Sequence, residues 1–249
     1  MNKSKTTIVL MAGGESSRFQ SVPGSETTNK NSFKLPNGDT MIEMCIRMYK
    51  TAGFTNFVAL LYHKSNTITD LLKDGSELGV NIAYSYDPDM PVGKGGAILN
   101  AIKNGSIPSD HTIIVHNPDD VILNFDGSFP DYIAQEHDKG IQNGTTATVV
   151  VVEETPYAYT GMTLDNGFVK DIEMYPMVKI PTHIGVTILD PKCFEYFEKL
   201  FDLTKKSDFE QVLFPILASE SKLFSASIPN ANWLAVNDLK AYKTLLKNL

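Results

Sequence analysis

The segment from Ile8 to Arg18 constrains the fold of this chain more than any other segment. It reads Ile-Val-Leu-Met-Ala-Gly-Gly-Glu-Ser-Ser-Arg, so a short apolar run stops at two glycines and one arginine follows. The apolar run predicts a buried strand. Glycines let a ligand approach the main chain, whose N–H groups can bind anions, and a guanidinium suits phosphate oxygens. We therefore expect a strand that leads directly into a phosphate-binding loop.

Strand-like and helix-like segments alternate along the first half, which is typical of an α/β fold with a largely parallel sheet. A polar loop, 13–39, separates the first strand from the first helix, and loops of that length inside a domain are often functional. Thr40 and Glu43 form a capping-box pattern where that helix begins. The expected strands are 6–12, 57–61, 80–85 and 111–116, and the expected helices are 40–52, 65–73 and 95–104.

The second half has a more antiparallel character. Its strongest hairpin signal is Asp165-Asn166-Gly167, a turn sequence between two strand-like runs. No repeat or clear linker divides the chain, so we predict a single domain over 1–249, with a nucleotide half of about 1–125 and an acceptor half of about 126–249. The expected strands are 145–152, 162–164, 168–173, 183–189 and 223–228, and the expected helices are 191–201, 208–219 and 237–246.

Composition limits the class of protein. The net charge of −7 disfavours a general binder of nucleic acid or of anionic membranes. No apolar run approaches the ~18 residues of a membrane span, and the first five residues lack the apolar core of a signal peptide. The two cysteines make no disulfide framework and fit a reducing compartment. We expect a cytoplasmic protein with neither nucleic-acid nor membrane partners.

Two common nucleotide-binding motifs are missing. A dinucleotide fingerprint needs a third glycine and a helix soon after Gly13-Gly14, and a P-loop needs a glycine where Pro88 stands. The segment 92–99 instead places Gly93 and Gly95 at the start of a helix, where N–H groups beside the positive end of the helix dipole attract anions. The structural alternative is a glycine turn that only begins a core helix.

Carboxylates follow the fourth expected strand in the sequence Asn117-Pro118-Asp119-Asp120. Adjacent carboxylates repel each other, and a divalent cation would resolve that conflict. Mg²⁺ favours one or two carboxylates completed by substrate phosphates. The sequence therefore indicates a magnesium site here, although an Asx turn after a strand is the simpler explanation.

In their order along the chain, these motifs resemble those of the sugar-1-phosphate nucleotidyltransferases. That family opens with Leu-x-Ala-Gly-Gly, an Arg, and a Lys ahead of a Leu-Pro…Gly…Met-Ile segment. Here the matching parts are Leu10 to Gly14, then Arg18, and then Lys30, with Lys34 as the second candidate. The resemblance covers nearly the whole chain. It implies a three-layer α/β/α sandwich of the nucleotide-diphospho-sugar transferase type, with a mostly parallel mixed sheet.

The resemblance also implies an activity, which is transfer of a nucleoside monophosphate from an NTP to a sugar-1-phosphate with release of pyrophosphate. The sugar phosphate attacks the α-phosphorus, so no protein nucleophile is needed. The partners are therefore the NTP and the sugar-1-phosphate, Mg²⁺ is the cofactor, and a homo-oligomer is compatible with the sequence. The implied residues are Arg18, Lys30 and Asp119 for catalysis; Ala12, Gly13, Gly14, Gly93 and Gly95 for the nucleotide; Gly161, Glu173 and His183 for the sugar; and Asp119 and Asn237 for the metal, with Asp120 second to Asp119.

Other readings stay open at this point. Asn237 also suits the N-cap of the last helix, and His183 also suits a packing position. A glycosyltransferase of related fold would need an Asp-x-Asp at a strand end, and Asp87-Pro88-Asp89 has that spacing but precedes the glycine loop. A non-catalytic sugar-nucleotide sensor is the third reading, because Ala235 stands where many members of the family carry a second metal-binding Asp.

Overall fold

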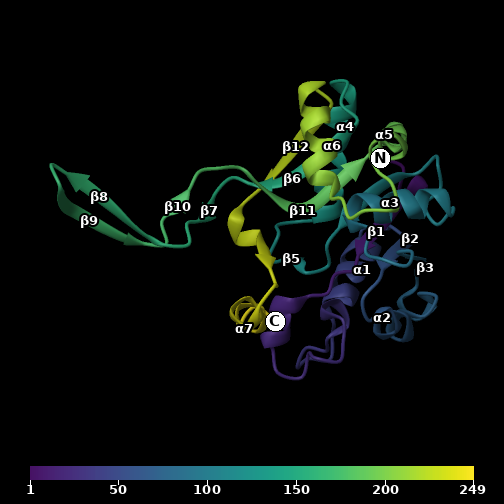
Figure 1. Ribbon diagram of the computed structural model, residues 1–249, viewed down its shortest axis with the longest axis horizontal. Helices are drawn as coiled ribbons and strands as arrows, with labels where there is room; N and C mark the ends of the chain where they lie inside the picture. Colours follow the sequence, from purple (N-terminus) through teal and green to yellow (C-terminus); the bar gives the residue numbers. More distant parts are fainter.

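A seven-stranded mixed sheet lies at the centre of the computed structural model, which describes residues 1–249 (Figure 1). All neighbouring strands are parallel except where β11 pairs with β4 and with β6. The predicted mostly parallel mixed sheet is therefore confirmed. In spatial order the strands are β12 (Leu223–Ile228), β6 (Ala147–Val152), β11 (Thr182–Leu189), β4 (Thr112–His116), β1 (Thr6–Met11), β2 (Asn56–Leu61) and β3 (Asn81–Tyr86).

Strand β1 occupies the middle of the sheet because both of its faces are apolar. Val9 lies opposite Val58 of β2 and Val115 of β4. The side chains of Ile8 and Leu10 join one hydrophobic core, and that of Val9 joins the other. A strand buried on both faces appears in sequence as a continuous apolar run, which is the feature that predicted it.

Helices cover both faces of the sheet, which confirms the predicted α/β/α sandwich. Ile8 and Leu10 pack in the same core as α1, α2 and α4, and Val9 packs in the same core as α3, α5 and α6. None of the helices is both long and apolar enough to span a membrane. Their bounds are α1 (Met41–Thr51), α2 (Ser65–Leu72), α3 (Gly93–Lys103), α4 (Phe129–Gln142), α5 (Phe194–Leu200), α6 (Phe209–Ser219) and α7 (Leu239–Leu246).

Two helix predictions need correction. The sequence prediction placed no element between 120 and 145, whereas α4 fills 14 residues of that stretch. Its start signals were present, because the Ser128 side chain accepts from the Asp131 N–H and Pro130 follows at the second helical position. Helix α7 begins at Leu239, and its cap is Asp238, whose carboxylate accepts from the Ala241 N–H. Asn237 is therefore not the N-cap of this helix.

The polar loop 13–39 is held in place by an apolar cluster of its own. It contains two short 3₁₀ turns, Ser17–Ser21 and Lys30–Ser32. Phe19 and Phe33 from the loop pack edge-to-face against each other and against Tyr242 of α7, with ring centroids 5.7 to 6.0 Å apart. The C-terminal helix thus supports the segment that carries Arg18.

A β-arm, residues 155–180, projects from the body of the molecule (Figure 1). The predicted turn is present, since Asn166 and Gly167 have φ values of 47° and 83° and connect the two long strands of the arm. Beside the sheet and the arm, a short pair links β5 (Asp120–Ile122) to β13 (Trp233–Ala235). The arm consists of β7 (Thr155–Pro156) paired with β10 (Met177–Val178), and β8 (Thr160–Asp165) paired with β9 (Phe168–Met174).

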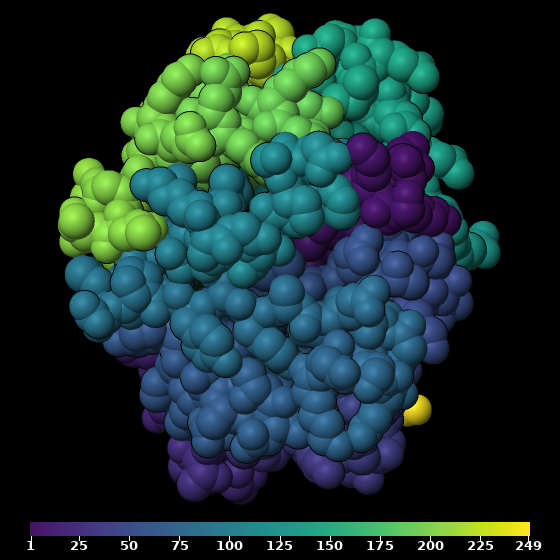
Figure 2. Space-filling view, turned by 90° about the vertical axis from the view of Figure 1, so that its right-hand side faces the viewer, coloured from purple at the N-terminus to yellow at the C-terminus, as the bar shows by residue number.

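The first residues of the chain lie on the side of the body shown in Figure 2, between the region of α4 and the region that ends α1. The Lys3 ammonium donates to the Ala52 carbonyl and to Asp131 of α4, both at 2.6 Å, and the N-terminal amine pairs with Asp138 of α4. These contacts fix the start of β1 and with it the position of the loop that follows.

Candidate active site

A pocket of about 610 Å³ lies where the parallel strands end. Met11, Tyr62, Asp87 and Asn117 line it, and they stand at or just beyond the carboxyl ends of β1, β2, β3 and β4. The chain passes from β1 to β2 and β3 on one side and returns to β4 on the other, so the strand order reverses at β1. Ligands of open α/β sheets bind at such a reversal.

The loop after β1 forms one wall of the pocket. Residues Gly13 to Arg18 all line it, and their six main-chain N–H groups have no hydrogen-bond acceptor within the chain. Ser16 lies in the left-handed region at φ 55°, which a non-glycine residue adopts at a cost. Ala12, just before, is buried below the loop, where its carbonyl accepts from the Asn29 amide at 2.8 Å. The loop thus offers a row of unused donors beside the Arg18 guanidinium.

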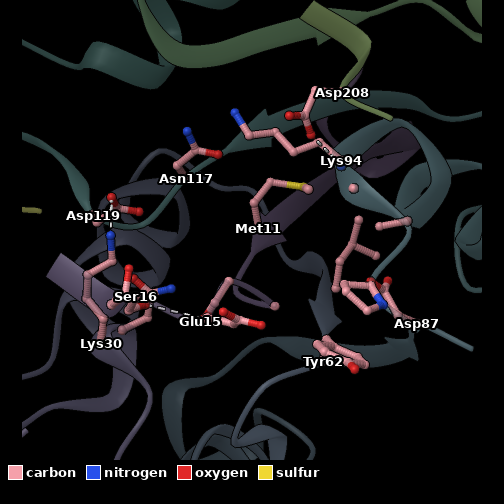
Figure 3. Close-up of a pocket in the computed structure, with 18 of the residues that line it drawn as sticks. Met11, Glu15, Ser16, Lys30, Tyr62, Asp87, Lys94, Asn117, Asp119 and Asp208 are labelled. Atoms are coloured by element: carbon pink, nitrogen blue, oxygen red, sulfur yellow. Dashed lines mark hydrogen bonds and ion pairs between the residues drawn. The ribbon is translucent and has the colours of Figure 1, made fainter. Parts of the chain in front are cut away.

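Three predicted residues from distant parts of the sequence meet in the pocket, and Figure 3 shows two of them, Lys30 and Asp119, side by side. The Lys30 ammonium donates to Asp119 Oδ2 at 2.6 Å and to Asn237 Oδ1 at 2.8 Å. Lys30 and Asp119 are both buried, whereas Lys34 is exposed and lies outside the pocket. The structure therefore places Lys30, and not Lys34, beside the expected metal ligands.

Asn29 explains why Lys30 points into the pocket. Its side chain caps the turn Lys30–Ser32 by accepting from the Asn31 N–H, and its amide donates to the carbonyls of Ala12 and His63. The turn is thereby tied to the ends of β1 and β2. Asn29 therefore holds Lys30 in place through side-chain hydrogen bonds.

The two adjacent aspartates have different environments. Asp120 accepts from the Asn117 amide and from the Trp233 indole, both at 2.9 Å. Burial, and then the charge of Asp119, raise the pKa of Asp120 to about 7. Asp119 instead faces the ammonium of Lys30. Asp120 is therefore held by neutral donors, while Asp119 is paired with a cation.

His116 fixes the turn that carries both aspartates. One ring nitrogen lies 2.9 Å from the Tyr49 hydroxyl and the other lies 2.9 Å from the Asp120 carbonyl oxygen. Burial lowers the pKa of His116 to about 4, so the ring is neutral near pH 7. A neutral ring can accept from the tyrosine and donate to the carbonyl, which locks the turn without adding charge.

The second glycine motif differs from its prediction. Three N–H groups at the start of α3 are bonded within the chain: that of Val92 to Asp87 at 3.1 Å, that of Lys94 to Asp208 at 3.0 Å, and that of Gly95 to the Ser207 carbonyl at 2.9 Å, whereas the N–H of Gly93 has no acceptor. Two carboxylates therefore already occupy the positive end of this helix dipole. These carboxylates disfavour an anion directly beside them, whereas no carboxylate is bonded to the N–H groups of the loop after β1.

The glycines of this motif also serve packing. A Cβ on Gly95 would lie 2.2 Å from the ring of Phe201, and Gly95 does not line the pocket. Gly93 does line it, at φ 74°, with Ser207 main-chain atoms 2.6 Å from the position of a Cβ. Lys94 pairs with Glu210 of α6. The motif brings α3 and the segment before α6 into close contact at one edge of the pocket.

The three predicted sugar-side residues lie outside the pocket. Gly161 and Glu173 are paired across β8 and β9 of the β-arm. His183 is half-buried in β11, where its Nε2 lies 3.1 Å from the Val186 carbonyl oxygen and its ring packs edge-on against Phe214. Burial lowers the pKa of His183, as expected for a histidine in a packing position. A role in sugar binding stays a prediction for all three.

Several pocket residues were missed by sequence reasoning. Tyr62 and Asp87 lie on the side of the pocket opposite Lys30 and Asp119, with Met11 between the two sides (Figure 3). The sequence could have indicated Tyr62 and Asp87 by their position, because each follows the carboxyl end of an expected strand, where ligands of such sheets bind. Asp208 and Lys206, which precede α6, gave no such signal. Only the packing of α6 beside α3 brings them to this edge.

With this geometry in view, comparison with known proteins decides the family. The Nucleotidyl transferase family model matches residues 7–249. The chain belongs to this family. The match spans the loop after β1, the Asp119 turn and α7, so every wall of the pocket lies within the matched region.

Individual relatives are distant. A protein from Oryza sativa subsp. japonica named "Probable mannose-1-phosphate guanylyltransferase 2" is 26% identical over 83% of this chain and 55% of its own. A UTP–glucose-1-phosphate uridylyltransferase from a Synechocystis strain is 24% identical over 94% of this chain and 61% of its own. The chain thus spans little more than half the length of these relatives. HddC from Yersinia pseudotuberculosis has the same fold, with a TM-score of 0.67 and 21% identity over 97% of this chain and 98% of that one.

Proposed function

We propose that this protein transfers a nucleoside monophosphate from an NTP to a sugar-1-phosphate and releases pyrophosphate. One observation carries the proposal: the six consecutive residues from Gly13 to Arg18, whose N–H groups have no acceptor within the chain, line the same pocket as the Lys30–Asp119–Asn237 cluster. Such a wall suits a polyphosphate, because oriented N–H groups and a guanidinium both bind phosphate oxygens. The named activities of the two sequence relatives act on the same class of substrate.

The chemistry needs placement and charge neutralisation more than it needs a nucleophile. A phosphate oxygen of the sugar phosphate attacks the α-phosphorus, the new P–O bond forms, and the bond to pyrophosphate breaks. Arg18 and the N–H groups of 13–18 neutralise the charge that builds on the leaving pyrophosphate. The two carboxylates at the start of α3, Asp87 and Asp208, repel the phosphates and leave that edge for the neutral nucleoside.

The Asp119–Asn237 cluster fits Mg²⁺. Both oxygens bond the same Lys30 nitrogen, so the site is built to surround a cation. No group of three or more His, Cys, Asp or Glu side chains is arranged for a metal, so substrate phosphates would complete the ligand set, as Mg²⁺ commonly requires. Bound there, Mg²⁺ would neutralise phosphate charge during the transfer. Lys30 would then leave these oxygens and turn its ammonium toward the phosphates.

The compartment is a smaller part of the proposal. Cys45 and Cys193 are both buried and free, and burial raises the pKa of each thiol. Unpaired thiols of this kind fit a reducing compartment such as the cytoplasm.

A second candidate function is binding of a sugar nucleotide without turnover. It is favoured by the position of Gly161 and Glu173, which stand on the β-arm and do not line the pocket. A catalytic protein needs an acceptor site beside the α-phosphate, whereas a sensor needs only the nucleotide wall.

The deciding experiment measures pyrophosphate release from a panel of NTPs, each paired with a panel of sugar-1-phosphates, with Mg²⁺ and with EDTA. The proposed function expects release from at least one pair, only with the metal, and only when both substrates are present. Calorimetry on the same protein tests the second candidate function. Tight binding of a sugar nucleotide, together with no pyrophosphate release from any pair of substrates, would favour a sensor over a transferase.

A further inference from the structure

The β-arm has one apolar face and one polar face. In the hairpin, Met162 lies opposite Ile172, and Leu164 lies opposite Val169. Residues two apart on a strand point to the same side, as do paired residues, so Met162, Leu164 and their partners share a face with Met174. A bulge in β9 between the two pairs keeps Val169 and Ile172 on this face although they are three residues apart. The opposite face carries Thr163, Asp165, Asp171 and Glu173, with Phe168 opposite Asp165 at the tip.

Nothing in the chain covers the apolar face. Its five large side chains, those of Met162, Leu164, Val169, Ile172 and Met174, are each at least half exposed. None of the three hydrophobic cores includes a residue of β8 or β9. A two-stranded hairpin is only marginally stable in water by itself, and a hairpin with one apolar face needs that face covered.

The exposed apolar surface of the molecule is concentrated here. Of its 14 exposed large hydrophobic residues, 11 lie between Tyr157 and Ile180. The other three are Tyr86, Met90 and Leu249. The body has one small hollow with a mostly apolar lining, of about 100 Å³, between α1 and β5, which is too small to hold a two-stranded face. The surface on a second copy of the chain that matches the arm in extent and character is the same face of its own arm.

We infer that two copies of this chain pair through the apolar faces of their β-arms, in a two-fold symmetric contact. Each of the five side chains exposes on the order of 100 Å², so the pair would bury about 1,000 Å², which is the lower limit for a specific interface. A two-fold contact brings the same patch together from both copies. The acidic side chains of the opposite faces then point outward, away from the contact.

This inference stands apart from the proposed function, because it rests on the arm and not on the pocket. An interface of this small area is typical of weak, transient contacts. A contact at the lower limit of area gives a dimer that dissociates on dilution, so the association must be measured over a range of concentrations.

The test is sedimentation equilibrium on the wild-type chain and on two lysine variants. Ile172→Lys places a charge in the middle of the apolar face, and Asp171→Lys places the same charge one residue away on the polar face. We expect the wild type to approach twice its 27.5 kDa mass at high concentration. Ile172→Lys should raise the dissociation constant at least about tenfold, since a buried unpaired charge is costly. Asp171→Lys should change it little.

A wild type that stays monomeric throughout, or two variants that weaken the dimer equally, would overturn the inference. Far-UV circular dichroism and the melting temperature confirm that both variants remain folded, which is expected because the arm makes no core contact. Failure of this inference is distinct from failure of the proposed function. A monomer that releases pyrophosphate refutes only the pairing, and a dimer that releases none refutes only the activity.

Discussion

Strands β1 and β9 of this protein differ in almost every physical respect, although both carry residues that the sequence singled out. The first five residues of β1 are fully covered and pack on both faces, whereas all seven residues of β9 are exposed. The residues after β1 enter a preformed pocket, while Glu173 on β9 does not. A functional motif is thus positioned only where the body packs around it, and the β-arm must find its contacts elsewhere.

The largest expected difference concerns the cluster at the pocket end of the body. Asp119→Asn should lower kcat/KM about 10³-fold, because it removes the carboxylate that faces Lys30 and would hold Mg²⁺. The matched control is Asp126→Asn, which makes the same change at an exposed position outside the pocket. Initial rates of pyrophosphate release measure both. Equal rates for the two variants would show that the Asp119 cluster takes no part in turnover.

Arg18 tests the loop side of the same pocket. Arg18→Ala should lower kcat/KM about 10²–10³-fold, the usual effect of losing one donor to a developing negative charge. Because the side chain is exposed and makes no ion pair, the melting temperature should not change. Arg47→Ala provides a control, since that arginine pairs with Asp39 away from the pocket. Near-normal turnover in Arg18→Ala would remove Arg18 from the mechanism.

Stability of the body should fall on mild acidification, through His137. This buried ring lies 3.0 Å from the Thr148 hydroxyl, and burial lowers its pKa to about 4. The pKa of the ring in the unfolded chain is near 6.5, so between pH 6.5 and about pH 4 the unfolded chain binds one proton more than the folded protein. The stabilisation that depends on the neutral buried ring is therefore complete above pH 6.5 and is lost as the pH falls. The loss reaches at most about 3 kcal/mol.

The measurement is urea unfolding of the wild type and of His137→Gln at pH 7 and pH 4.5. The pH dependence of stability also includes a change of the same sign from His116 and one of opposite sign from Asp120, whose pKa is raised. Both residues are present in the wild type and in the variant, so the difference between the two proteins isolates His137. The stability difference between the proteins should narrow at pH 4.5. A constant difference would mean that the buried ring is protonated in the folded state.

The smallest expected effect compares the two strands directly. Ile8→Val should reduce the free energy of unfolding by about 0.5–1.5 kcal/mol, as for a methylene removed from a packed core. Ile172→Val on the β-arm should leave it unchanged in protein dilute enough to be monomeric, since that side chain is 59% exposed. Chemical unfolding of both variants at one low concentration makes the measurement. Equal losses would mean that the arm is packed against the body in solution.

Local patterns predicted most of the elements. The apolar run before Gly13, the Thr40 cap and the Asn166-Gly167 turn all formed as expected, since each depends on contacts within a few residues. Helix α4 was missed even though Ser128 and Pro130 marked its start, because its charged residues obscured the apolar periodicity. That error came from an incomplete reading of the sequence and not from a missing signal.

The glycines show the opposite case. Gly13 and Gly95 look alike in sequence, as each is the first of two adjacent glycines. Gly13 begins the run of unbonded N–H groups, whereas Gly95 packs against Phe201 and gives its N–H to Ser207. The partners that separate them lie more than a hundred residues away, so no local pattern distinguishes a ligand-binding glycine from a packing one.

By itself, the sequence determined the order of strands and helices, the loop from Gly13 to Arg18, and the turn that carries Asp119. The tertiary structure decided which lysine meets that aspartate, because Asn29 ties the Lys30 turn to the ends of β1 and β2, and it added Asn237, 207 residues from Lys30. It also decided that carboxylates fill the start of α3 and that Glu173 stands on the β-arm. The physical reason is range: propensity and periodicity act over one or two turns, whereas a site is made where distant segments pack together.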